Sequence, residues 1–226
     1  MEMEESIAAG AMFSVLSQLI FAEPEDATII SMAEDDLFAD APYGGDDPDV
    51  RKGFELVRGW LKANIADAED PKKALEELRR DWLQLIAGVG VPKAPSWAGF
   101  YLSTTGATVS EETLGVRRLY RRYGFELARP NCEPDDHLGI MMGFIGYLIG
   151  EELSGNDTVA DQLWLLEDRI LPWMPAWLYS MDKYAKTDYF RGLGYAIFGL
   201  CSRYATRFDI QYNAEEKAYF RKQAEE

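Results

Sequence analysis

The stretch that decides the fold is Leu138-Gly-Ile-Met-Met-Gly-Phe-Ile-Gly-Tyr-Leu-Ile149, which contains no charged residue. Its glycines at 139, 143 and 146 continue to Gly150, and spacings of three and four place them on one side of a helix. Each glycine inside a helix costs about 1 kcal/mol relative to alanine. We therefore expect a compensating contact, most simply a second helix whose backbone approaches this side. Since a membrane span needs roughly 20 apolar residues, the stretch predicts a buried helix of a globular protein.

Helical spacing recurs on both sides of this stretch. Apolar residues lie three or four positions apart within 50–65, 75–85 and 159–170. Further helices are expected over about 3–21, 28–38, 111–123, 188–204 and 214–224, with ends uncertain by roughly 2–4 residues. No series of short strands with alternating apolar residues is present. The sequence predicts an all-α fold of roughly eight to ten helices.

Three segments interrupt the helices, namely 41–48, 88–108 and 171–177. The first is an acidic, turn-rich connection whose prolines and glycines stop helix propagation. The second is the longest irregular stretch, and its aromatic side chains argue against disorder because they need apolar cover. The third carries Trp173 and Trp177, which we expect to pack on the helices. None of the three has the composition of a flexible linker, so one compact domain is expected over 1–226.

Charge narrows the possible partners. The chain has 23 Lys and Arg against 39 Asp and Glu, a net charge of −16, which disfavours nucleic-acid binding and favours positively charged partners. Cys132 and Cys201 lack metal-ligand spacing, and reduced thiols in a cytoplasmic protein are the simpler interpretation. The N-terminus is acidic where a secretory signal would be basic, and no transmembrane span is expected.

The segment before the central helix is Glu133-Pro134-Asp135-Asp136-His137, and it contains the only histidine of the chain. Proline suits the first position of a helix, which would place Asp135, Asp136 and His137 in the first turn. Carboxylates there complement the helix dipole, and the same carboxylates can bind a cationic ligand. His137 is open to two interpretations in the same way, as a capping residue or as part of a site.

At these residues the sequence resembles the TorD/DmsD/NarJ-like family of molybdoenzyme assembly chaperones, and most closely its TorD/DmsD branch. The family hallmark Glu-Pro-x-Asp-His is matched at every fixed position. The segment 81–86 resembles the family's aromatic-x-x-Leu-Phe segment, with Ile86 in place of Phe. Residues 95–102 are similar to its Pro-Pro-Trp-x-Ser-Val-Tyr-Leu loop, from which Ser96, Gly99 and Phe100 depart. Residues 171–178 resemble its Leu-Pro-Trp-x-x-x-Trp-Leu turn, so the likeness runs from about 75 to 204.

The resemblance implies a cytoplasmic helical chaperone that is not an enzyme and has no cofactor or metal of its own. Such a protein binds the twin-arginine signal peptide of a molybdoenzyme catalytic subunit and holds the apoprotein until its cofactor is inserted. The family contains monomers and helix-swapped dimers. The implied peptide-binding residues are Trp82, Leu85, Ile86, Trp97, Tyr101, Glu133, Pro134, Asp135, Asp136 and His137.

Physical chemistry is consistent with this role. A twin-arginine signal joins two guanidinium groups to an apolar segment, so its receptor needs carboxylates beside apolar side chains. Acidic residues of the hallmark and the rings of Trp82, Trp97 and Tyr101 can supply both. Core packing explains Trp82 equally well, whereas aromatic residues in a loop are less easily explained by packing. Reversal of Asp135 and Asp136 to Lys is expected to abolish peptide binding and to leave the helical content unchanged.

Two other functions are open. One is an all-α hydrolase that uses Asp136 and His137 as an acid–base pair, although adjacent helical residues do not face each other. The other is an acidic adaptor that docks a folded partner and would not need Trp97. The basic block Arg117-Arg118-Leu-Tyr-Arg121-Arg122 either pairs with acidic residues of its own chain or meets an acidic area of a client.

Overall fold

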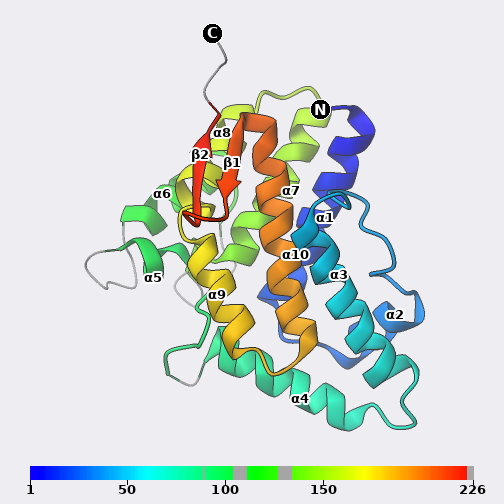
Figure 1. Cartoon of the computed structure of the whole chain (residues 1–226). Coiled ribbons are helices and arrows are strands. Elements are labelled where there is room, and N and C mark those ends of the chain that lie inside the picture. The colour runs from blue at the N-terminus through cyan, green and yellow to red at the C-terminus, as the bar shows by residue number, and fades with distance from the viewer. Residues whose placement is uncertain (89, 104–110, 127–133, 223–226) are drawn as a thin grey trace. The chain divides into compact units, whose positions relative to one another are not determined.

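The computed structural model describes residues 1–88, 90–103, 111–126 and 134–222. These residues contain ten α-helices and one two-stranded sheet, which confirms the all-α prediction. The helices are α1 (Met3–Phe21), α2 (Asp26–Glu34), α3 (Pro48–Leu61), α4 (Lys72–Trp82), α5 (Ala98–Leu102), α6 (Glu111–Arg122), α7 (Leu138–Leu153), α8 (Val159–Trp164), α9 (Met174–Tyr184) and α10 (Asp188–Ala205). Short π-helical turns extend α3, α4 and α8 (Figure 1). None of the described helices combines the length and the apolar character needed to cross a bilayer.

The helices belong to two compact units, each built from separate stretches of the chain. Unit 1 comprises Met1–Phe21, Ser96–Pro175 and Tyr204–Glu226, and unit 2 comprises Ala22–Pro95 and Ala176–Arg203. In unit 2, for example, Val50, Phe54, Val57 and Leu61 recur at helical spacing and are all buried. The expectation of one domain over the whole chain stays a prediction.

In unit 1, α1 runs beside α7 (Figure 1), and small residues bring the two backbones together. A Cβ atom added to Gly139 would lie 2.8 Å from the carbonyl oxygen of Ser17, and one added to Gly146 would lie 3.2 Å from that of Gly10. The expected close helix is therefore α1. Gly150 has no neighbour within 4 Å, so the contact ends before it.

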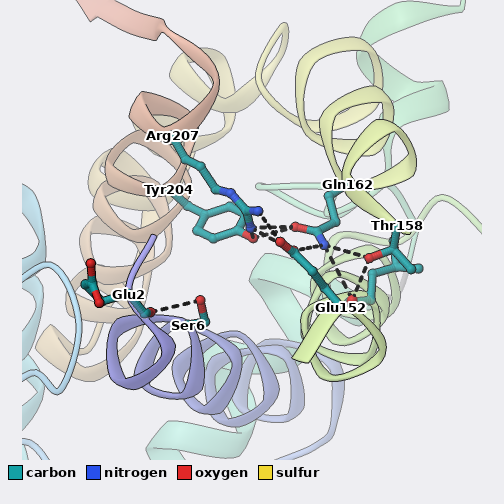
Figure 2. A network of polar contacts seen from close by, with 8 residues as sticks. Glu2, Ser6, Glu152, Thr158, Gln162, Tyr204 and Arg207 are labelled. Atoms are coloured by element: carbon teal, nitrogen blue, oxygen red, sulfur yellow. Dashed lines mark hydrogen bonds and ion pairs between the residues drawn. The ribbon is translucent and has the colours of Figure 1, made fainter. Parts of the chain in front are cut away.

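A partly buried polar network joins the end of α7 to α8 and to the end of α10, also within unit 1 (Figure 2). The amide of Gln162 donates to Thr158 Oγ1 at 2.9 Å and to Glu152 Oε2 at 2.8 Å, and its oxygen accepts from the Tyr204 hydroxyl at 2.5 Å. Arg207 forms an ion pair with Glu152. Because these groups bond to one another, the network can hold the three helix ends in one arrangement.

In unit 2, α3 packs closely against α10. A Cβ atom on Gly53 would lie 2.3 Å from the backbone nitrogen of Ala196, and one on Gly192 would lie 2.7 Å from the carbonyl oxygen of Gly53. The α3 helix begins with Pro48 after Asp47, whose carboxylate accepts from the N–H groups of Asp49 and Val50. This is the expected chemistry of a helix start.

The helix predicted over 214–224 is wrong. The chain forms an antiparallel hairpin of β1 (Ile210–Asn213) and β2 (Ala218–Arg221) instead. Asp209 has a left-handed backbone (φ 59°), which ends the preceding helical turn, and Asn213 Oδ1 accepts from the N–H groups of Glu215 and Glu216. This side-chain turn competes with a helix, and Tyr212 packs on Tyr219 across the strands at 5.1 Å.

Candidate functional site

The hallmark turn (residues 134–137) precedes α7 and is not its first turn, so the predicted helix start was wrong. The N–H of His137 donates to the carbonyl of Pro134 at 3.0 Å, which closes a turn, and His137 has an extended backbone (ψ 133°). The helix begins at Leu138, and His137 is its N-cap. The reason is a non-local strand-like pairing of His137 with Trp97, which requires an extended residue at this position.

This pairing ties the hallmark turn to the aromatic segment (residues 96–102), which contains α5. The N–H of Leu138 donates to the carbonyl of Ser96 at 2.6 Å, and that of Ala98 donates to the carbonyl of Asp136 at 3.1 Å. The Asp136 carboxylate accepts from the N–H of Gly99 at 2.6 Å in the first turn of α5. Two motifs that lie almost 40 residues apart in the sequence are therefore one structural piece.

Asp136 and His137 are buried, and each is engaged separately. Asp136 is fully buried and His137 is 3% exposed. Burial raises the pKa of the Asp136 carboxyl, although the bond from Gly99 opposes this. Burial lowers the pKa of His137 to about 4, and its Nδ1 accepts from the N–H of Gly139 at 3.1 Å. The imidazole is thus neutral near pH 7, and no hydrogen bond between the two side chains occurs among the residues that the structure describes. The geometry does not support an acid–base pair.

Asp135 pairs with the basic block. Its Oδ2 accepts from Arg117 Nε at 3.0 Å and from Nη2 at 2.7 Å, and the Tyr120 hydroxyl donates to its carbonyl at 3.1 Å. The hydrogen bond that Arg117 donates to Asp135 raises the pKa of Arg117. No hydrogen bond to Asp135 Oδ1 is found within the described ranges, so one carboxylate oxygen retains its acceptor capacity.

Two further arginines of the block also pair within the chain. Arg122 contacts Asp161 at 2.6 Å, and Arg121 contacts Glu126 at 3.5 Å. This supports the interpretation in which the basic block is balanced by acidic residues of its own chain.

Aromatic side chains lie next to the hallmark turn. Phe21, at the end of α1, meets the His137 ring edge-on at 5.2 Å between centroids. In the aromatic segment, Trp97 contacts Phe100, Phe100 contacts Tyr101 at 5.0 Å, and Tyr101 stacks on the buried Trp173 at 4.9 Å. Phe100 is 50% exposed and Phe21 is 39% exposed. Unit 1 therefore presents aromatic surface next to the acidic turn.

The structure thus brings together five predicted site residues of unit 1: Trp97, Pro134, Asp135, Asp136 and His137, with Tyr101 joined through Phe100. Glu133 lies outside the described residues. The other three belong to unit 2, where Leu85 and Ile86 are buried in the turn after α4 and Trp82 is half-buried. Their role in peptide binding stays a prediction.

Sequence reasoning missed Phe21, Phe100 and Arg117 as neighbours of the site. Phe21 is the last residue of a helix that carries no motif, and Phe100 differs from the family pattern at its position. The positive charge of Arg117 indicates an acidic partner. Asp135 is 18 positions away in the sequence, however, and this spacing gives no reason to pair the two residues.

The burial of these acids also bears on the expected effect of charge reversal. Lysine at position 135 would face Arg117, and lysine at position 136 would bury an unpaired charge against the N–H of Gly99. We therefore expect both substitutions to disturb the fold, so milder substitutions are needed to test the site.

Comparisons with known proteins agree with the motifs. A family model described as nitrate reductase delta subunit matches residues 46–178. The chain is 25% identical over 119 residues to the Tat proofreading chaperone DmsD of Salmonella typhi, which is 53% of this chain and 56% of that protein. It is 25% identical over 171 residues to the chaperone protein TorD of Photobacterium profundum, which is 73% of this chain and 77% of that protein.

The match thus spans little more than half the length of the DmsD relatives. A solved structure of a proposed redox enzyme maturation protein from Archaeoglobus fulgidus aligns with a TM-score of 0.47 and 18% identity, over 88% of this chain and 93% of that one. The family model covers more than half of the chain, and its range includes the hallmark turn and the aromatic segment. The chain therefore belongs to the nitrate reductase delta subunit family, which is the NarJ/TorD family.

Proposed function

We propose that this protein is a cytoplasmic chaperone that binds the twin-arginine signal peptide of a molybdoenzyme catalytic subunit. It holds the apoprotein until the molybdenum cofactor is inserted, and it has no catalytic activity or cofactor of its own. Support comes from the family, from the names of the DmsD and TorD relatives, and from one observation in unit 1. That observation is the bond between Gly99 and Asp136, which joins the acidic turn to the aromatic segment.

In this proposal Asp135 binds an arginine of the peptide, and Phe100 contacts apolar atoms of the peptide. A guanidinium group of the peptide donates to Asp135 Oδ1, and Arg117 continues to occupy Oδ2. A charged hydrogen bond of this kind contributes about 1.5–3 kcal/mol. The half-exposed ring of Phe100, with Tyr101 beside it, covers the apolar parts of the peptide side chains next to the arginines. Asp136 and His137 act indirectly, because they hold the aromatic segment in place.

The first test is titration calorimetry with a synthetic peptide that contains two adjacent arginines followed by an apolar segment. Asp135→Asn keeps an oxygen for Arg117 and removes the charge, and we expect it to lower affinity roughly ten- to a hundredfold. A peptide with lysines in place of the arginines should bind more weakly, because lysine lacks the planar fork. Equal affinity of the two proteins for the arginine peptide would contradict the assigned site.

The aromatic contact has its own matched control. Phe100 and Phe220 are 50% and 45% exposed, and both belong to unit 1. Phe100→Ala is expected to weaken peptide binding about tenfold, which is the loss expected when one aromatic contact is removed. Phe220→Ala should leave binding unchanged.

Affinity purification from the native host, followed by mass spectrometry, identifies the client. A molybdoenzyme catalytic subunit is the protein that we expect to recover.

A further inference from the structure

The outward side of α1 is an unusual surface for this chain. Residues 6–22 contain no ionisable side chain, although 23 basic and 39 acidic residues are distributed over the 226 residues. One side of α1 packs on α7, and the side that adjoins this contact is exposed. We call it the α1 outer face, and it consists of Met3, Ile7, Ala11, Ser14, Val15, Gln18 and Phe21. At 100° per residue, these positions span about 120° of the helix surface, an arc that also includes the exposed Glu4 at the start of the helix.

Large apolar side chains dominate the exposure of this face. Met3 is 67% exposed, Ile7 54%, Val15 40% and Phe21 39%. The helix has 19 residues, so the face is about 28 Å long. A helix side that faces only solvent normally carries charged residues. An exposed apolar strip of this extent therefore indicates an interaction surface.

The α1 outer face continues into the candidate site. Phe21 ends the face and packs on His137, and His137 is two residues from Asp135 in the hallmark turn. A peptide whose arginine reaches Asp135 therefore has Phe21 within a short distance, and the axis of α1 leads away from that point. The absence of charge over residues 6–22 fits an apolar segment, whereas a basic segment would find no carboxylate along this part of the face.

We propose that the α1 outer face binds the apolar segment that follows the two arginines of the signal peptide. This inference rests on the proposed function and extends its site from the hallmark turn to most of the length of α1. Burial of Ile7 and Val15 against the peptide then supplies affinity that does not depend on charge. The arrangement is a helix face that receives an apolar segment, which is a common mode of peptide recognition.

The test uses two peptides and one double variant. The long peptide contains the two arginines and the apolar segment, and the short peptide ends after the arginines. Ile7→Asp combined with Val15→Asp places two carboxylates on the face at exposed positions. We expect this variant to bind the long peptide at least about tenfold more weakly and the short peptide as well as the parent protein does.

Val159→Asp is the matched control, because Val159 is 38% exposed and lies at the start of α8, where a carboxylate suits the helix dipole. It should bind both peptides normally. Circular dichroism and thermal unfolding show whether each variant is folded, and Ile7→Ser with Val15→Ser is the alternative if the charged variant is not. Equal loss of both peptides, or no loss of either, overturns the inference.

A cross-linking measurement needs no variant. A long peptide with a photoreactive group in its apolar segment should attach to residues 3–21 of the parent protein. These residues lie in the first tryptic fragment, because Arg51 is the first basic residue of the chain. Attachment elsewhere overturns the inference and leaves the proposed function intact, whereas failure of the parent protein to bind either peptide removes the proposed function itself.

Sedimentation of the protein without peptide tests the other occupant of such a face, a second copy of the chain. A dimer that the Ile7→Asp and Val15→Asp variant abolishes would assign the α1 outer face to self-association and overturn the inference. If the parent protein and the variant both sediment as monomers, the result supports the inference.

Discussion

His137 illustrates how one side chain links the fold to pH. Its pKa is lowered to about 4 by burial, against an ordinary value of 6.5, so between these pH values the unfolded chain binds a proton that the folded chain does not. Stability is therefore expected to decrease as pH falls from about 6.5 to about 4, by about 3 kcal/mol for this group. Above pH 6.5 the contribution is fully present.

Two measurements check this expectation. As the only histidine, His137 gives an unambiguous proton NMR signal, which should show no titration between pH 8 and about 5 in the folded protein. Urea unfolding across the same range compares the parent with His137→Asn, which retains an oxygen for the N–H of Gly139 and does not titrate. A midpoint near pH 6.5 in the folded protein would contradict the burial argument.

In unit 2, the carboxylate of Asp81 supports an element that is distant in the sequence. It is 2% exposed, and its Oδ2 accepts from the N–H groups of Lys186 and Thr187 and from the Thr187 hydroxyl at 2.8–2.9 Å. Thr187 immediately precedes α10, and its hydroxyl accepts from the N–H of Phe190 at 3.4 Å. The acidic side chain therefore fixes the start of α10.

Asp81→Ala is expected to lower the free energy of unfolding by about 3 kcal/mol, because buried donors lose a charged acceptor. The control is Glu76→Ala on the same helix, where an exposed pair with Arg80 at 3.3 Å contributes less than about 1 kcal/mol. Chemical denaturation measures both. Similar losses for the two variants would show that Asp81 does not support α10 in this way.

At the scale of elements, the contact between α1 and α7 depends on which glycines face the partner helix. A Cβ atom at Gly139 would lie 2.8 Å from the Ser17 carbonyl oxygen and 2.7 Å from Phe21 Cβ, whereas at Gly150 it would meet nothing within 4 Å. Gly139→Ala should therefore destabilise the protein by roughly 1–3 kcal/mol. Gly150→Ala should stabilise it by up to about 1 kcal/mol. The thermal unfolding midpoint should therefore fall for Gly139→Ala and rise for Gly150→Ala. A higher midpoint for both variants would mean that the two helices can move apart at no cost in stability.

At the scale of the whole molecule, the net charge of −16 governs the approach of a basic peptide. Long-range attraction raises the association rate and depends on salt, because the screening length falls from about 10 Å at 0.1 M to about 3 Å at 1 M. In stopped-flow experiments the association rate should fall about tenfold as salt rises over this range. The dissociation rate should change much less. An association rate that does not depend on salt would show that the acidic surface does not steer the peptide.

Much of the fold was predictable because helix periodicity is a local property of the sequence. The α1 helix was expected over 3–21 and spans Met3–Phe21, and the expected ends of α6 and α10 agree with the structure to within a residue. The glycine spacing of α7 also predicted a close helix, although it could not show which one. Where a local turn competes with a helix, as at Asn213, periodicity alone was insufficient and the hairpin was missed.

The sequence by itself determined the helical class, the family and the motifs of the site, because each depends on residue types at short spacing. Only the tertiary structure decided what those residues do. Asp136 bonds to Gly99, Asp135 is shared with Arg117, and Phe21 comes from the first helix to His137. Packing and the burial of charge select such partners, and both act between residues that are close in space. The spacing of these residues along the chain therefore does not predict which of them become partners.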